Sequence, residues 1–214
     1  MYVPTHFAES NIDVLHQLMR AHPFATLITM SSAGINANHV PLHLIPEAGQ
    51  YGALQGHVAR ANPVWSDLVH EVEALVIFQG PDAYISPSWY PTKQIDGKVV
   101  PTWNYITVHA YGTLRVIDDP AWVKNQLESL TTQLEASFEK PWAIADAPMA
   151  FTDNMINAIV GVEILITKLV GKWKLSQNQP ALNQAGVVQG LQSLKQSEAT
   201  ELASAVEKAH KKAR

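Results

Sequence analysis

Three stretches of the sequence combine cations, aromatic rings and small polar groups that could hold a flat, anionic ligand. The first is residues 56–63 (GHVARANP), where a β-type run meets the start of a helix. Backbone N–H groups at such a corner, with the side chains of Arg60 and Asn62, could seat a phosphate. The alternative is an ordinary turn in which Asn62 caps the helix and Arg60 is solvated. The residues alone leave both interpretations open.

The second stretch is dense in aromatic and hydroxyl side chains. It comprises residues 78–90 (FQGPDAYISPSWY) and 100–105 (VPTWNY). Such side chains can stack on a flat ring system and hydrogen-bond its edges. They could equally form an aromatic core beneath a proline-rich loop.

The third stretch is residues 171–178 (GKWKLSQN). Because alternate residues of a strand point the same way, Lys172, Lys174 and Ser176 would share one face if the strand continues, and Trp173 would take the other. Two cations and a hydroxyl on one face suit a phosphate. The alternative is an exposed strand end that leads into a capped helix.

The amino-acid composition excludes several other kinds of functional site. The chain has 214 residues, 47% of them apolar and 16% charged, which suits one domain, or one domain with a small appendage, and a sizeable core. It has no cysteine, which excludes disulfides, Cys-ligated zinc, iron–sulfur clusters and thiol catalysis. The formal net charge of −4 means that any nucleic-acid contact needs a local basic patch.

Metal and hydrolase motifs find no support either. His39 and His43 on a strand would lie about 13 Å apart at ~3.3 Å per residue, too far to chelate one ion. The sequence has no H-E-x-x-H helix and no G-x-S-x-G elbow. It also has no signal peptide and no apolar run of the ~18 residues that cross a bilayer, so we expect a cytoplasmic protein without a membrane partner.

The three stretches lie within a chain that has many β-type segments, and these segments must position them. We expect helices over 10–22, 62–69, 118–134, 180–194 and 197–212, with a shorter one that ends at 158–160 and is closed by Gly161. We expect strands over 24–30, 36–45, 51–59, 73–80, 83–90, 99–117 and 162–174, with an edge or bulge at Pro41 and a bend or break near Gly112. The strands do not alternate strictly with helices. This favours a mainly β, α+β fold, an antiparallel barrel with peripheral helices, over a doubly wound sheet.

Together with residues 1–4 (MYVP) and 22–27 (HPFATL), the three stretches resemble the PaiB family of FMN-binding proteins, described as negative transcriptional regulators. The matching motifs occur in the family's order and extend to about Leu191. The resemblance implies an antiparallel split β-barrel like that of the pyridoxine-phosphate oxidases, noncovalent FMN, and a homodimer with the flavin near the subunit interface. It also implies a regulatory role: the family's namesake represses protease and sporulation genes.

The matching motifs also supply candidate ligands for FMN. We expect an FMN-binding split-barrel domain over 1–178 and a C-terminal helical extension over 179–214. The polar and cationic members of the motifs are assigned to the phosphate, and the aromatic members with one histidine to the ring. The phosphate group comprises Arg60, Lys172, Lys174, Ser176 and Asn62, and the ring group comprises Trp103, Tyr105 and His57.

Two functions of different class remain open. One is a flavin-binding regulator that contacts DNA or another protein, and the other is a flavin-dependent oxidoreductase that acts on a small molecule. No helix-turn-helix is recognisable in the sequence. The cationic cluster at the end of the last helix (Lys208, Lys211, Lys212 and Arg214) could contact DNA, or it could simply complement the helix dipole.

Overall fold

The computed structural model describes residues 1–69 and 72–212 and divides into two compact units. Unit 1 comprises residues 1–11, 79–108 and 170–214, and unit 2 comprises residues 12–78 and 109–169. Three long strands, β6 (Ala74–Ile85), β7 (Thr102–Ile117) and β8 (Ile159–Lys174), each contribute to both units. No helix in the described part of the chain is long and apolar enough to cross a membrane.

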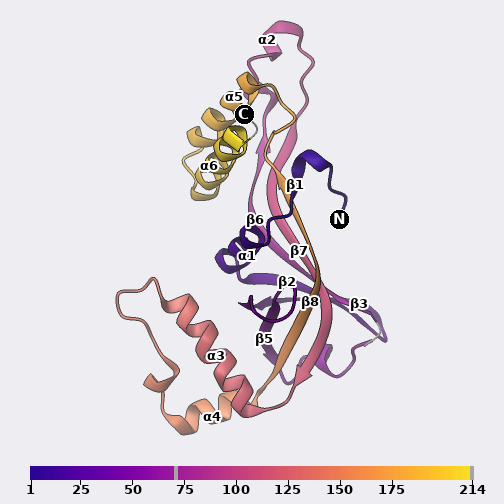
Figure 1. Cartoon of the computed structure of the whole chain (residues 1–214). Helices are drawn as coiled ribbons and strands as arrows, with labels where there is room; N and C mark the ends of the chain where they lie inside the picture. The colour runs from indigo at the N-terminus through magenta and orange to yellow at the C-terminus, as the bar shows by residue number, and fades with distance from the viewer. Residues whose placement is uncertain (70–71, 213–214) are drawn as a thin grey trace. The chain divides into compact units, whose positions relative to one another are not determined.

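Unit 2 is built on an antiparallel sheet with helices beside it (Figure 1). The strands follow the order β3-β2-β6-β7-β8-β5-β4, and β2–β3, β2–β6, β4–β5 and β5–β8 pair antiparallel. The elements that lie wholly in this unit are α1 (Ile12–Ala21), β2 (Phe24–Ser31), β3 (Gly34–Pro41), β4 (His43–Ile45), β5 (Ala53–Ala59), η2 (Pro63–Trp65), α3 (Pro120–Glu135), η4 (Ile144–Asp146) and α4 (Met149–Asn157).

The chain closes this sheet on itself at Leu42. Strands β3 and β4 stand at opposite ends of the strand order, yet only Leu42 separates them in sequence. Leu42 is buried, and its N–H donates to the Pro23 carbonyl over 2.9 Å. The two outer strands of the sheet are therefore held next to each other, as in a barrel. The single strand expected over 36–45 is wrong for this reason, whereas the edge position expected for Pro41 is confirmed.

The two faces of strand β5 have different roles. On one face Leu54 and Val58 pair with Ile164 and Val160 of β8, and all four side chains are buried. His57 lies on the opposite face, which α3 covers. This alternation places an apolar core on one side of β5 and a polar interface with α3 on the other.

Two strands are longer and more continuous in the structure than the sequence predicted. β6 is continuous through residues 80–82, where a turn was expected; Pro81 lies beyond Leu75–Ile77, the segment that pairs with β2. A missing N–H therefore costs no bond to β2. β7 passes unbroken through Gly112. A Cβ at this position would lie 2.2 Å from the carbonyl oxygen of Leu165. The glycine permits a close approach of strands and does not break the strand.

Two helix ends also differ from expectation. Helix α4 ends at Asn157 with Ala158 as its C-cap, and Gly161 lies inside β8. The helix expected over 62–69 is only the short 3-10 helix η2, with Pro63 at its first turn. The long helix expected from Asp118 is confirmed as α3, which Asp119 caps by accepting from Ala121 N over 2.9 Å.

Unit 1 contains the two expected C-terminal helices, which lie side by side (Figure 1). Leu191 and Leu202 are among the side chains buried in these helices. The elements that lie wholly in this unit are η1 (Thr5–Phe7), β1 (Ala8–Glu9), η3 (Pro87–Trp89), α2 (Lys93–Asp96), α5 (Ala181–Ser193) and α6 (Ser197–Lys212). Since these helices share a unit with residues 1–11 and 79–108, the expected boundary at 178 stays a prediction.

Gly190 of α5 lies against the indole of Trp89, where a Cβ would come within 2.1 Å of a ring carbon. We predict that Gly190→Ala lowers the free energy of unfolding by about 1–3 kcal/mol through overpacking. In an open helix the same change would instead stabilise by about 1 kcal/mol. Urea denaturation measures the difference, with the exposed Gln189→Ala on the same helix as control. A stabilised Gly190→Ala variant would contradict the packing described here.

Candidate functional site

Lys172 places a largely buried cation on β8 in unit 1. The residue is only 8% exposed. Its Nζ donates to the Tyr2 carbonyl oxygen over 3.1 Å and lies 5.2 Å from the ring centroid of Tyr105 and 5.8 Å from that of Tyr2. A carbonyl and two aromatic faces stabilise an ammonium group without neutralising its charge.

Lys174, two residues along the same strand, is a second partly buried cation. Its Nζ donates to the Thr102 hydroxyl and to the Trp103 carbonyl oxygen, and lies 6.0 Å from the Phe7 ring. Burial lowers the pKa of Lys174, and the positive charge of Lys172 lowers it further. The two ammonium groups are therefore close enough to repel each other.

Neither ammonium group has a carboxylate partner among the residues that the structure describes, and every oxygen that accepts from them is neutral. Charges taken out of water are unfavourable unless an opposite charge accompanies them. The positive charges of Lys172 and Lys174 are therefore not neutralised by any described residue, and we call these two residues the lysine pair.

Ser176, expected to help bind the phosphate, follows the end of β8. Its side chain is buried and is hydrogen-bonded to Asn104. Its φ of 63° lies in the left-handed region, so the regular strand alternation does not reach it. Its Oγ accepts from Asn104 Nδ2 over 2.9 Å and lies 3.2 Å from Asn104 Oδ1. Gln177 fixes the same turn by accepting from Leu175 N and donating to the Trp173 carbonyl. Ser176 thus joins β7 to the end of β8, next to the lysine pair in sequence.

Trp103 offers an open aromatic surface in the same unit. It is 54% exposed, and its ring meets that of Tyr84 edge to face at 6.1 Å. Its own carbonyl accepts from Lys174, which ties the position of Trp103 to the lysine pair. Tyr105, two residues along β7, contacts Lys172. The structure thus brings Trp103, Tyr105 and the lysine pair together.

Arg60, in unit 2, is occupied by protein partners. Both of its Nη atoms donate to the Asp118 carboxylate, at 3.0 and 2.6 Å, and its Nε donates to the Asn157 carbonyl over 2.9 Å. Hydrogen bonding to Asp118 raises the pKa of Arg60, and the same contact lowers the pKa of Asp118. This arginine joins the end of β5 to the residues that flank α3 and α4.

Asn62 likewise has a structural role in unit 2. Its Oδ1 accepts from Val64 N over 3.0 Å and so caps η2, while its Nδ2 donates to Asn38 Oδ1 over 2.7 Å. The capped turn weighed for residues 56–63 is therefore present, and the partly exposed Arg60 is also paired with Asp118.

His57 belongs to a polar interface that the sequence analysis missed. Its Nδ1 lies 3.0 Å from Gln126 Oε1, and His43 Nδ1 lies 2.7 Å from Gln133 Oε1. Gln126 and Gln133 are seven residues apart on α3, so they share one face of that helix. A glutamine carbonyl oxygen can only accept, so Nδ1 of each histidine is the donor in these two contacts. The polar spacing on α3 is the signal that could have indicated this interface.

Other groups in the described chain have unused polar atoms. The hydroxyl of Tyr90, Nδ1 of His109 and Nε2 of Gln126 are buried without a hydrogen-bond partner. Burial raises the pKa of Tyr90 and lowers the pKa of His109. Tyr90 ends the aromatic stretch 78–90 that the sequence singled out, whereas the sequence around His109 and Gln126 did not mark those two residues. Among the residues that contact the lysine pair, Tyr2 and Thr102 were also not singled out as ligands.

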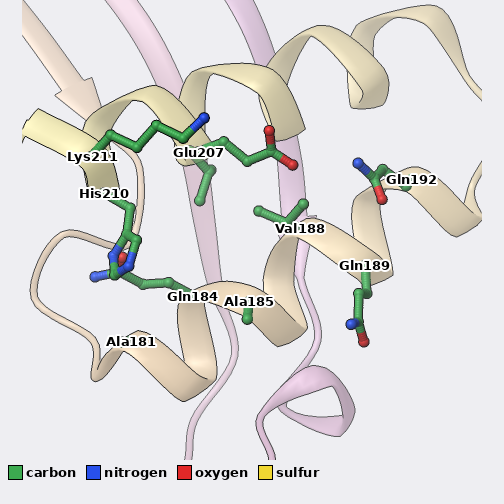
Figure 2. Close-up of a pocket in the computed structure, with 10 residues that line it drawn as sticks. Ala181, Gln184, Ala185, Val188, Gln189, Gln192, Glu207, His210 and Lys211 are labelled. Atoms are coloured by element: carbon green, nitrogen blue, oxygen red, sulfur yellow. The ribbon is translucent and has the colours of Figure 1, made fainter.

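A groove of about 360 Å³ lies between α5 and α6. Figure 2 shows Gln184, Ala185 and Val188 of α5 on one side and Glu207, His210 and Lys211 of α6 on the other. None of the expected FMN ligands lines it. Small apolar side chains, amides and charges of both signs line the groove. The groove therefore lacks the single sign of charge that the lysine pair has.

Comparison with known proteins places the chain in a family. The family described as "Putative FMN-binding domain" matches residues 1–168. The chain is 34% identical to an uncharacterized protein of Emericella nidulans over 91% of each chain. It is 32% identical to the "Protease synthase and sporulation protein PAI 2" of Bacillus subtilis over 99% of each chain.

Solved structures share the fold at low sequence identity. A conserved hypothetical protein from Mycobacterium tuberculosis superposes with a TM-score of 0.58 at 12% identity, covering 84% of this chain and 94% of that one. The flavocytochrome Anf3 from Azotobacter vinelandii gives 0.56 at 13% identity, covering 80% and 72%. The expected α+β fold of split-barrel type is confirmed. With its family match and its full-length relative in Bacillus subtilis, this chain belongs to the PaiB family of "Putative FMN-binding domain" proteins.

Proposed function

We propose that this protein binds FMN noncovalently, with the phosphate on the lysine pair. The observation that carries the proposal is the presence of two neighbouring, partly buried ammonium groups whose partners are all neutral. A phosphate monoester brings close to two negative charges and several acceptor oxygens, which match two cations. The family description supports the same cofactor.

The surroundings of the lysine pair also fit the rest of FMN. Trp103 is exposed enough to stack on a flat ring, and Tyr105 lies beside it in sequence on β7. His57, expected from the sequence to contact the ring, belongs to unit 2, and its role stays a prediction. When bound, the flavin supplies reversible electron transfer, while the protein holds and orients it.

Arg60, Asn62 and Ser176 have a weaker case as phosphate ligands. Arg60 would have to exchange Asp118 for the phosphate, Asn62 would leave the cap of η2, and Ser176 would leave Asn104. Each exchange gives up contacts already formed within the protein. The lysine pair gives up none that carries opposite charge, and we therefore assign the phosphate to it first.

We also propose that the protein is a flavin-binding regulator. Support comes from the name of the Bacillus subtilis relative, which refers to protease synthesis and sporulation and which matches over the whole chain. A basic surface for DNA would include Lys208 and Lys211, exposed on α6. Arg214, also expected to belong to this cluster, lies outside the described residues. An oxidoreductase is the second candidate, favoured by the exposed face of Trp103 at the proposed ring site.

The first prediction tests the phosphate site. Lys172→Ala and Lys174→Ala should each weaken FMN binding about ten- to hundredfold, because each removes a charge-assisted contact worth ~1.5–3 kcal/mol. Arg60→Ala should have a smaller effect, since Asp118 already engages it. Flavin fluorescence quenching measures the affinity, and Lys168→Ala, exposed on the same strand, is the control. Wild-type affinity in both lysine variants would refute the assignment.

The second prediction concerns assembly. In the segment between β6 and β7, Ile95 and Val100 are 76% and 72% exposed, which is unusual for large apolar side chains and suits a second copy of the chain. We expect a homodimer of about twice 23.5 kDa in sedimentation at micromolar concentration with FMN present. The double variant Ile95→Asp/Val100→Asp should shift it towards the monomer. A wild-type monomer would disprove the dimer.

The third prediction tests DNA contact. Deletion of residues 207–214 should abolish binding to DNA and leave FMN binding intact, because the lysine pair is elsewhere in unit 1. Lys208→Ala/Lys211→Ala removes charge while keeping the helix and should weaken DNA binding most at low salt. Mobility shifts across a salt series are the measurement. If the full-length chain binds no DNA at low salt, the DNA proposal fails, and an oxidoreductase or a protein partner takes its place.

A further inference from the structure

The N-terminal segment Tyr2–Phe7 lies against both cations of the lysine pair. Tyr2 contacts Lys172 through its carbonyl oxygen and its ring, and the ring of Phe7 lies 6.0 Å from Lys174 Nζ. Strand β1, which follows directly, pairs Ala8 with Lys172. The segment is therefore fixed next to the two residues that carry the charge.

The contacts of Tyr2 leave Lys172 able to bind an anion. An ammonium group has three N–H donors, and the Tyr2 carbonyl accepts one of them. The rings of Tyr2 and Tyr105, at 5.8 and 5.2 Å from Nζ, restrict where the ammonium group can lie. The remaining donors are thus held in place for an acceptor that the protein itself does not provide.

The position of Tyr2 is not explained by burial of its side chain. Phe7 is buried and holds the segment by packing, whereas Tyr2 is 82% exposed. An exposed ring gains little from the hydrophobic effect. Its contacts with Lys172, through the carbonyl and the ring, are therefore the interactions that account for its position.

We propose that Tyr2 is a positioning residue for phosphate recognition, which orients the Lys172 ammonium group and forms a wall of the lysine pair. The inference rests on the proposed function and adds to it a recognition element from the N-terminal segment. It acts on the phosphate half of FMN and not on the flavin ring.

The test is a double-mutant cycle read out by FMN affinity. Tyr2→Ala should weaken FMN binding about two- to fivefold, the range expected for loss of a cation–π contact at an exposed ring. The same change in a Lys172→Ala background should have no further effect, because Tyr2 acts through Lys172. Tyr2→Phe keeps the ring and should bind FMN like the wild type; both variants keep the backbone carbonyl that accepts from Lys172. Thr5→Ala, exposed in the same segment, is the control.

Riboflavin, which lacks the phosphate, separates the possible failures. Its affinity should not change in Tyr2→Ala, and the thermal midpoint without flavin should match that of the wild type. If Tyr2→Ala binds FMN normally, or weakens FMN equally in the Lys172→Ala background, the role of Tyr2 is refuted while FMN binding stands. If the wild type binds no FMN, the proposed function fails and this inference fails with it.

Discussion

The sheet of unit 2 is constrained by a single residue, because Leu42 joins strands that stand at its two ends. A flat sheet could not satisfy this connection, because its two end strands would lie far apart. The sheet must therefore curl until the end of β3 and the start of β4 lie next to each other in space. Burial of Leu42 and its hydrogen bond to Pro23 fix the turn. The positions of the polar groups follow from this closure. Since Leu54 and Val58 fill the inner face of β5, His57 lies on the outer face, where Gln126 of α3 is its hydrogen-bond partner.

Strand β8 connects this framework to the lysine pair at a cost in stability. Its apolar residues in unit 2 belong to the core. Its last residues, in unit 1, include Lys172 and Lys174. Because burial and the charge of Lys172 lower the pKa of Lys174 below its value in an unfolded chain, the protonated amine opposes folding at neutral pH. That penalty is fully present at low pH and is relieved when the amine loses its proton or gains an anion. A charge arrangement that disfavours the folded state without a ligand is expected at a functional site.

The extent to which the site could be predicted depends on the range of the interactions. Alternation along residues 171–174 correctly indicated that both lysines share a face, since this depends only on local strand geometry. The alternation failed at Ser176, because β8 ends at Lys174 and Ser176 has a left-handed φ of 63°. It could not assign Arg60, because its partner Asp118 is distant in sequence and both a salt bridge and a phosphate suit a guanidinium group. Tyr2 was missed because a backbone carbonyl has no sequence signal.

Unused bonding capacity distinguishes the residues of the matching motifs more clearly than residue type does. Arg60, Asn62 and Ser176 are chemically suited to phosphate, yet each already has its donors or acceptors satisfied within the protein. They hold together strand ends, caps and turns within the fold. Lys172 and Lys174 differ because their neutral partners leave the charge uncompensated. The three sequence stretches therefore mix residues that maintain the framework with cations whose charge no described residue neutralises, and the charge balance of each group separates the two.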